Sequence, residues 1–242
     1  MHKQVTGIIG AMDEEVAILR SRMEAVCSEK SGKFEYLTGR LAGKEIVLLK
    51  CGVGKVNAGA GCAILLDRYH PGLVINTGCA GGINSESDAI KLNFGDVVLG
   101  SNLVQHDVDV CGLGYPAGRI PGHERYFEAS PAILDRAEAV IKELKTEGAL
   151  PQTMKQVRGL IGSGDVFMCE AARIKAVAAL FPGLRAVEME GAAIAHVCSL
   201  FNVPCLVIRA LSDIAGEESP VTYTEYLPVA AQHSSEIVTR LA

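Results

Sequence analysis

The chain contains no tryptophan, and only 5% of its 242 residues are aromatic. It has no run of lysine or arginine and a formal net charge of −5, so it lacks the basic patch that binding to nucleic acid or an anionic membrane requires. No segment reaches the roughly 18 consecutive apolar residues of a membrane-spanning helix. Acids soon interrupt the apolar stretch of the N-terminal MHKQVTGIIGAMDEEV, so we expect no secretory signal and a soluble cytoplasmic protein.

The eight cysteines form no C-x-x-C motif. Most lie inside apolar runs such as GCAILL and VPCLVI, which predicts small buried side chains rather than a disulfide framework or a zinc site. His196 and Cys198 are the one close histidine and cysteine pair, and a spacing of two on a helix turns them to different faces. The sequence therefore predicts no metal site.

Apolar material is plentiful, with 49% hydrophobic and 21% charged residues, which is enough for a sizeable core. Short β-branched apolar runs recur along the chain, and segments of helical length separate most of them. This alternation predicts an α/β fold in three layers, with a central mixed sheet flanked by helices on both faces. Because no linker, repeat or low-complexity segment interrupts the pattern, we expect a single domain over residues 1–242.

The expected elements follow from periodicity. Predicted strands cover residues 5–11, 45–52, 73–78, 96–104, 157–164, 186–189 and 205–212, and residues 34–49 predict an antiparallel hairpin. Predicted helices cover residues 13–26, 55–69, 131–147, 170–180, 191–201 and 222–241. Residues 106–127 show no periodicity, and so long a connection in a compact domain is typical of a lid, a binding loop or an interface.

Acids follow several predicted strands, at the edge where α/β sheets bind ligands. Glu15 lies in the triplet DEE, Glu190 in EMEG and Asp213 in ALSD. A single acid at a helix start is explained by the helix dipole, which stabilises it by about 0.3–1 kcal/mol. A purely structural ion pair between Arg209 and Asp213 would likewise account for both of those residues.

The glycine-rich segments CGVGKV and NTGCAGG match neither a phosphate loop nor a dinucleotide-binding fingerprint. They predict a close approach of the backbone to a helix or a ligand, and in NTGCAGG a turn after the third strand. Phe167 in SGDVFM is either a flat surface for a ring or a core side chain. Acids at three strand ends favour a neutral or cationic transition state, as in glycoside cleavage, which needs no metal and no cofactor.

Several segments, in their order and spacing, also resemble a known family. They are GIIGAMDEEV, GVGKVNA, NTGCAGG, SGDVF, AVEMEGAAIAHVC, NVPCLVIRALSD and YLPVAA. The chain is similar over about residues 5–235 to the 5'-methylthioadenosine/S-adenosylhomocysteine nucleosidases, within the purine nucleoside phosphorylase superfamily. The resemblance implies hydrolysis of the N-glycosidic bond of an adenine nucleoside without a cofactor. It also implies a homodimer in which the segment 106–127 reaches the neighbour's pocket for the 5'-substituent.

The resemblance further implies roles for individual residues. Glu15 looks like the general base that activates water, and Asp213 resembles the general acid that protonates adenine N7. Glu190 matches the carboxylate that binds the ribose hydroxyls, where an anion favours a cationic sugar. The remaining implied contacts are Met189 against the sugar, Phe167 stacked on adenine, the Met168 backbone at the adenine edge, Val53 and Tyr226 at the 5'-substituent, and Arg209 and Ser212 behind the water and Asp213, with Glu188 in support.

Two positions depart from the family pattern. Cys79 stands in NTGCAGG where many members have serine, so a weak thiol donor replaces a hydroxyl. Leu113 stands in the long segment where an aromatic residue is often found, which bears on the preferred 5'-substituent.

Alternative functions remain open at this point. A phosphate-dependent phosphorylase of the same superfamily needs positive charge or N–H donors, whereas GIIGAMDEEV offers acids. Other 5'-modified substrates, including 5'-deoxyadenosine and aminodeoxyfutalosine, fit the sequence as well as 5'-methylthioadenosine and S-adenosylhomocysteine do. A non-catalytic purine-nucleoside binding protein is expected to lack one of Glu15, Glu190 and Asp213, and all three are present.

Overall fold

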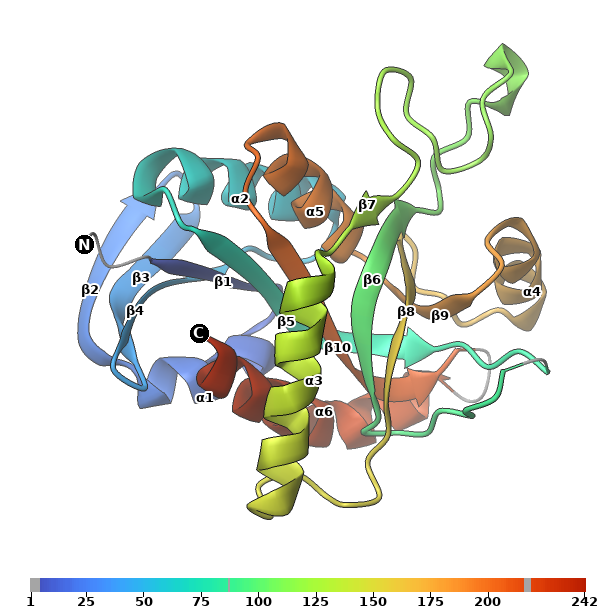
Figure 1. The fold of residues 1–242 in the computed structure, drawn as a ribbon. Helices are drawn as coiled ribbons and strands as arrows, with labels where there is room; N and C mark the ends of the chain where they lie inside the picture. The colour runs from blue at the N-terminus through green and yellow to red at the C-terminus, as the bar shows by residue number, and fades with distance from the viewer. Residues whose placement is uncertain (1–4, 87, 216–218) are drawn as a thin grey trace.

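The computed structural model describes residues 5–86, 88–215 and 219–242, with side chains in the last helix described from residue 224 onward. It has a central mixed sheet with helices on both faces, which confirms the predicted α/β fold (Figure 1). Among the described residues, no helix has the length and apolar character needed to cross a membrane.

The elements alternate along the chain much as the periodicity predicts. The strands are β1 (Thr6–Gly10), β2 (Glu24–Ser31), β3 (Phe34–Leu41), β4 (Lys44–Lys50), β5 (Leu73–Gly82), β6 (Val97–Gln105), β7 (Phe127–Glu128), β8 (Gln156–Ser163), β9 (Leu184–Glu188) and β10 (Cys205–Ile214). The helices are α1 (Asp13–Arg22), α2 (Lys55–Tyr69), α3 (Pro131–Thr146), α4 (Ala171–Leu180), α5 (Gly191–Leu200) and α6 (Ser219–Leu241), with a short 3-10 helix η1 (Cys111–Leu113).

The sheet runs in the order β10-β6-β8-β9-β5-β1-β4-β3-β2, and β10 also pairs with β5. This second pairing closes β5, β9, β8, β6 and β10 into a ring, while β1 to β4 extend from β5 as an open sheet. The parallel strands β1, β5 and β10 run side by side, so their carboxyl ends meet at one edge. That edge is where a ligand site is expected in an α/β fold.

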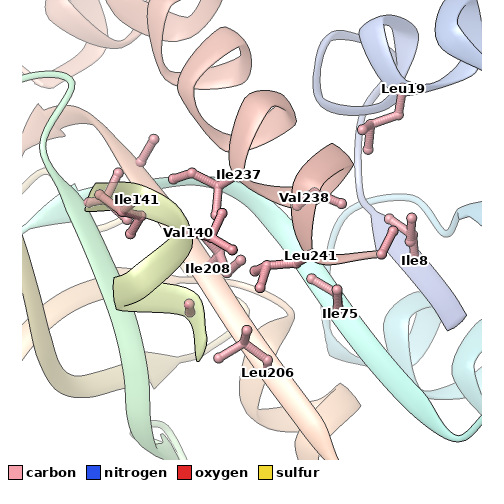
Figure 2. Close-up of a cluster of buried hydrophobic side chains, with 14 of the residues drawn as sticks. Ile8, Leu19, Ile75, Val140, Ile141, Leu206, Ile208, Ile237, Val238 and Leu241 are labelled. Carbon is pink, nitrogen blue, oxygen red and sulfur yellow. The ribbon is translucent and has the colours of Figure 1, made fainter. Parts of the chain in front are cut away.

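The core lies on both faces of the sheet. Ile8 and Ile9 point to opposite faces because side chains alternate along a strand, and each joins a separate buried cluster. Helices α2 and α5 pack together on one face, and α6 packs with α1 and α3 on the other. Figure 2 shows α6 side chains, including Ile237 and Leu241, close to Ile75 and Ile208 of the sheet. Burial of each such side chain stabilises the fold by about 1.5–3 kcal/mol.

Near the N-terminus the structure differs from the prediction of a helix over residues 13–26. Helix α1 ends at Arg22, Met23 adopts an extended conformation, and strand β2 begins at Glu24. Strand β2 is almost entirely exposed and lies at the edge of the sheet beside β3. Because its side chains are exposed, the sequence of β2 lacks the apolar alternation that predicts a strand. Backbone hydrogen bonds with β3 form the strand instead.

Candidate active site

A cavity of about 230 Å³ opens at the carboxyl edge of the sheet. Its walls come from the segments after β1, β4, β8 and β9 and from the last residues of β5, β9 and β10. It is lined by Ala11, Met12, Glu15, Val53, Cys79, Ala80, Gly81, Val166, Phe167, Met168, Val187, Glu188, Met189, Glu190, Ser212 and Asp213. The three acids that the sequence places after different strands therefore surround one small space.

Glu15 lies in the first turn of α1 and is only 5% exposed. One carboxylate oxygen accepts the backbone N–H groups of Ala11 at 2.7 Å and Met12 at 3.1 Å. The other accepts the backbone N–H of Cys79 at 3.1 Å and lies 3.3 Å from its thiol sulfur. These donors satisfy a carboxylate that would otherwise be costly to bury, and they fix its direction.

Strand β5 continues to Gly82, so the turn predicted in NTGCAGG is wrong. Glycine is needed here for another reason: side chains from neighbouring elements occupy the space where a Cβ atom would lie. A Cβ at Gly78 would lie 2.6 Å from an Oε1 atom of Glu15, and one at Gly81 would lie 3.1 Å from Oδ2 of Asp213. The strand therefore passes directly beneath two carboxylates.

Asp213 lies near the end of β10 and is 2% exposed. The Ser212 hydroxyl donates a hydrogen bond to its Oδ1 atom at 2.9 Å. The pairing of β10 with β5 shifts between Leu211 and Asp213, where a bulge breaks the two-residue alternation of the strand. The bulge turns Asp213 away from the direction of Arg209, four residues earlier.

The structural alternative of an ion pair between Arg209 and Asp213 is therefore wrong. Arg209 pairs instead with Glu188 at the end of β9, and its Nη2 also donates to the Asn76 side chain at 2.6 Å. Arg209 is 1% exposed, so its charge requires this partner. It lies behind the cavity wall that Glu188 forms.

Glu188 is held as a buried anion. One oxygen accepts the Ser163 hydroxyl, and the other accepts the backbone N–H groups of Glu190 at 3.0 Å and Gly191 at 2.7 Å in addition to Arg209. Burial opposes ionisation, but the charge of Arg209 and these hydrogen bonds keep the pKa of Glu188 below its usual value. Sequence reasoning missed Ser163 and Asn76. An amide inside the apolar run LVINTG was the available signal for Asn76.

Glu190, two residues away, is in the opposite situation. It lies at the N-cap of α5 with 7% exposure, and one of its oxygens accepts the backbone N–H of Gly54 at 2.8 Å. Burial, together with the charge of Glu188, raises the pKa of Glu190 to about 7. A ligand that donates hydroxyl groups to this carboxylate would favour its charged form.

The cysteine beside Glu15 stays protonated. Burial, with the Glu15 charge nearby, raises the pKa of Cys79 well above its usual value. The neutral thiol lies within donor distance of Glu15, as the hydroxyl of a serine there would. Cys79 therefore adds a weak donor to the carboxylate at the cavity wall.

The remaining predicted residues divide into two groups. Val53, Phe167, Met168 and Met189 line the cavity, and both Val53 and Phe167 are 47% exposed at its opening. Leu113 and Tyr226 lie outside it. Leu113 is 74% exposed on η1, in a segment that extends away from the body of the molecule (Figure 1). Tyr226 stacks on Phe94, with ring centroids 4.6 Å apart.

The site can do acid–base chemistry on an uncharged ligand. It combines an anion held by N–H donors, a carboxyl next to a hydroxyl, a carboxylate that titrates near neutrality and an apolar opening. Within the part of the chain that the structure describes, no cluster of three or more histidine, cysteine or acidic side chains is placed to bind a metal ion.

Comparison with known proteins agrees with this architecture. The family model of the phosphorylase superfamily matches residues 5–242. A 5'-methylthioadenosine/S-adenosylhomocysteine nucleosidase of Geobacillus sp. (strain WCH70) is 47% identical over 231 residues, which cover 96% of this chain and 94% of the relative. Among solved structures, the nucleosidase of the same name from Colwellia psychrerythraea 34H, in complex with adenine, has a TM-score of 0.91 at 40% identity and covers 99% of this chain and 95% of that one.

A futalosine hydrolase of Helicobacter pylori is also similar, with a TM-score of 0.86 at 31% identity and coverage of 99% of this chain and 97% of that one. The fold and the acid-lined cavity thus define an enzyme of the phosphorylase superfamily. Within that superfamily, the chain belongs to the family of 5'-methylthioadenosine/S-adenosylhomocysteine nucleosidases, which confirms the resemblance seen in the sequence, and it is an N-glycosidic hydrolase.

Proposed function

We propose that this chain hydrolyses 5'-methylthioadenosine and S-adenosylhomocysteine, and also 5'-deoxyadenosine, to adenine and the 5'-substituted ribose. The observation that carries the proposal is the convergence of Glu15, Glu190 and Asp213 on one cavity of about 230 Å³. The substrates are those in the name of the Geobacillus relative, and adenine is bound in the Colwellia structure. A non-catalytic binding protein would have no use for all three acids.

Asp213 acts as the general acid. It protonates adenine N7, so that the base leaves as a neutral molecule rather than as an anion. Its position supports this role because the Ser212 hydroxyl orients the carboxyl group and because burial excludes competing water. Arg209 acts on the site indirectly, since it keeps Glu188 charged and in place.

Glu15 acts as the general base that takes a proton from the attacking water. The N–H groups of Ala11, Met12 and Cys79 stabilise its anionic form and hold it at the cavity wall. The Cys79 thiol contributes a weaker contact than a serine hydroxyl would. Water is the nucleophile in this arrangement because an anionic phosphate beside this carboxylate would be repelled.

Glu190 binds the ribose hydroxyls, with Met189 against the sugar. As the glycosidic bond breaks, positive charge develops on the ribose, and the ionised carboxylate stabilises it. Phe167 stacks on adenine, and the Met168 backbone hydrogen-bonds the edge of the base. Val53 contacts the 5'-substituent at the cavity opening.

The chain works as a single-domain subunit of a homodimer. Val53, Val56 and Leu113 support the dimer, since they are large apolar side chains with exposures of 47%, 80% and 74%. Leu113 of one subunit and Tyr226 then complete the pocket for the 5'-substituent. Sedimentation at working concentration tests this arrangement, and a monomer with full activity would contradict it.

The decisive experiment is adenine release from 5'-methylthioadenosine in phosphate-free buffer, with the sugar product identified and a parallel reaction that contains phosphate. We expect free methylthioribose at a rate that phosphate does not change. A sugar 1-phosphate formed only with phosphate would identify a phosphorylase instead. Aminodeoxyfutalosine is the substrate to compare next, because of the similarity to the Helicobacter pylori enzyme.

A further inference from the structure

Two segments that are distant in sequence both contribute to the cavity wall. Residues 52–54 carry Val53 and the N–H that binds Glu190, while residues 164–168 carry Phe167 and Met168. No strand pairing joins them, because the first follows β4 in the open sheet and the second follows β8 in the ring. Something else must therefore set the distance between them.

A network of charged groups joins the two segments. Asp165 accepts the backbone N–H of Lys55 at 2.8 Å and donates its own backbone N–H to Asp107 at 3.0 Å. The ammonium group of Lys55 completes the network, since it forms an ion pair with Asp107 at 2.5 Å and donates a hydrogen bond to Gln105 at 3.2 Å. We call Lys55, Asp107 and Asp165 the latch.

The ion pair of the latch is largely shielded from solvent and stays charged. The side chains of Lys55 and Asp107 are only 17% and 26% exposed, which limits screening by solvent. Burial opposes ionisation of Asp107, but the hydrogen bonds from Lys55 and from the Asp165 N–H lower its pKa. Asp107 therefore stays charged at neutral pH, and the ion pair persists.

The latch is continuous with the sugar-binding carboxylate. The N–H groups of Gly54 and Lys55, which are consecutive at the start of α2, bind Glu190 and Asp165 respectively. Gly54 has a φ of +94°, and a Cβ there would lie 3.1 Å from Oδ1 of Asp165, so the approach is close. Moving Asp165 consequently moves the residue that holds Glu190.

We propose that Lys55, Asp107 and Asp165 are positioning residues that fix the adenine-binding segment relative to Glu190. The inference rests on the proposed function for its kinetic consequence. Adenine and ribose can each still bind when the latch is broken, but the transition state requires both to be held at once. Loss of the latch is therefore expected to lower kcat more than it raises KM.

The test compares Asp165→Ala with Asp165→Asn. The alanine variant loses the acceptor for the Lys55 N–H, and we expect kcat/KM to fall about 10- to 100-fold. The asparagine variant keeps a carbonyl oxygen that can accept this bond, so it should retain most of the activity. Equal losses in both variants would contradict the proposed role of Asp165.

Asp107→Asn and Lys55→Met test the ion pair. Each should lower kcat about 10-fold, and the double variant should be little worse than either, because the two side chains act as one unit. Asp135→Asn is the matched control, since Asp135 on α3 forms an exposed ion pair with Arg158 on β8 and neither residue lines the cavity. Additive losses would show that the pair does not work as a latch.

A pH profile separates positioning from general loss of structure. Glu188, Glu15, Arg209 and the Gly54 N–H all influence ionisation of Glu190. When the latch loosens, the Gly54 bond weakens, so the acid limb of kcat/KM should move up by about one pH unit. An unchanged acid limb in active Asp165→Ala would overturn the proposal.

Amide hydrogen exchange keeps the inference separate from the proposed function. Asp107→Asn should accelerate exchange in residues 53–56 and 165–168 together, whether or not the wild type hydrolyses a given nucleoside. Acceleration in only one segment would overturn the latch while leaving the hydrolase intact. A wild type without turnover but with coupled exchange would refute the activity and keep the latch.

Discussion

The floor and the rim of the cavity are built by different means. We define the floor as Glu15, Glu188, Arg209, Ser212 and Asp213, all at most 8% exposed and all tied to strands or to a first helical turn. We define the rim as Val53 and Phe167, both 47% exposed and both in connecting segments. In the floor, each charged side chain has an ion-pair or hydrogen-bond partner or is fixed in position by its strand. The rim instead presents apolar surface that only a ligand or another subunit can cover.

This difference separates chemistry from recognition. Buried charges are tolerated when they are paired with an opposite charge or hydrogen-bonded, so the floor has little freedom to change. The rim can vary without such a penalty, since an exposed apolar side chain alters binding and not the ionisation of its neighbours. Substitutions in the floor should therefore affect kcat or stability, and substitutions in the rim should affect KM.

The largest effect is expected for Asp213→Asn. An amide cannot deliver a proton to adenine N7, so we expect kcat to fall by about 10²- to 10⁴-fold. The fold should be retained, because asparagine can still accept the Ser212 hydrogen bond. Steady-state kinetics with a thermal melt of the same sample measures both, and turnover close to wild type would remove Asp213 from the role of acid.

Arg209→Met should have an effect of comparable size, but on the free energy of unfolding rather than on kcat. It leaves the buried Glu188 without its cation, and breaking a buried pair in this way costs about 3–5 kcal/mol. Adding Glu188→Gln should recover part of the loss because the unpaired charge is removed. Chemical denaturation measures the free energy of unfolding of each variant. A single variant as stable as the wild type would show that Glu188 finds another partner.

The charged residues of the cavity show how much of the site the sequence predicts. The acids at 15, 190 and 213 were predictable because a carboxylate that interrupts apolar runs at a strand end needs an explanation. The partner of Arg209 was not, because Glu188 is 21 positions away on another strand and a bulge separates Arg209 from the nearer Asp213. Alternation along a strand cannot reveal such a bulge in advance.

The latch and strand β2 were not predictable for a related reason. Lys55 and Asp165 are 110 positions apart and look like ordinary surface residues in their local sequence. Strand β2 is almost wholly exposed, so it carries no apolar pattern. Sequence periodicity reports which side chains are buried, and it is silent where backbone pairing or exposed charges determine the structure.

Glu190→Gln tests whether the negative charge of Glu190, and not only its hydrogen bonding, is needed for catalysis. The neutral amide can still bind hydroxyls but cannot stabilise a cationic sugar, so we expect kcat to fall by about 10²-fold. Because the pKa of Glu190 is about 7, wild-type activity should decline as the pH falls below that value and the carboxylate takes up a proton. The variant should lack this decline. Kinetics from pH 5 to 9 measures it, and an identical profile would assign the limb to another group.

Phe167→Ala is the corresponding change in the rim. Loss of stacking on the base should weaken substrate binding by about 1–3 kcal/mol, with KM raised more than kcat is lowered. Phe167→Leu is the matched control, since it keeps apolar area without an aromatic face. A loss confined to kcat in the alanine variant would mean that the rim takes part in the chemistry and that the proposed separation from the floor is wrong.

The smallest expected effect is on the pH dependence of stability, through the contacts that join the extended segment 106–127 to the body of the molecule. The His196 ring on α5 lies 3.3 Å from a nitrogen of His123 in that segment and 3.3 Å from the Gln105 amide, and it stacks on Phe127. Burial, together with the charge of His123, lowers the pKa of His196 from 6.5. The folded protein therefore prefers the neutral ring, while the unfolded chain binds a proton more readily.

It follows that the stabilising contribution of a neutral His196 is complete above pH 6.5 and is lost as the pH falls through the lowered folded value. The change in the free energy of unfolding should be small, because solvent partly screens the ring. Denaturation at pH 5 and pH 8 measures it in the wild type and in His196→Gln. Equal pH dependence in both proteins would show that the connection between this segment and α5 does not respond to protonation of His196.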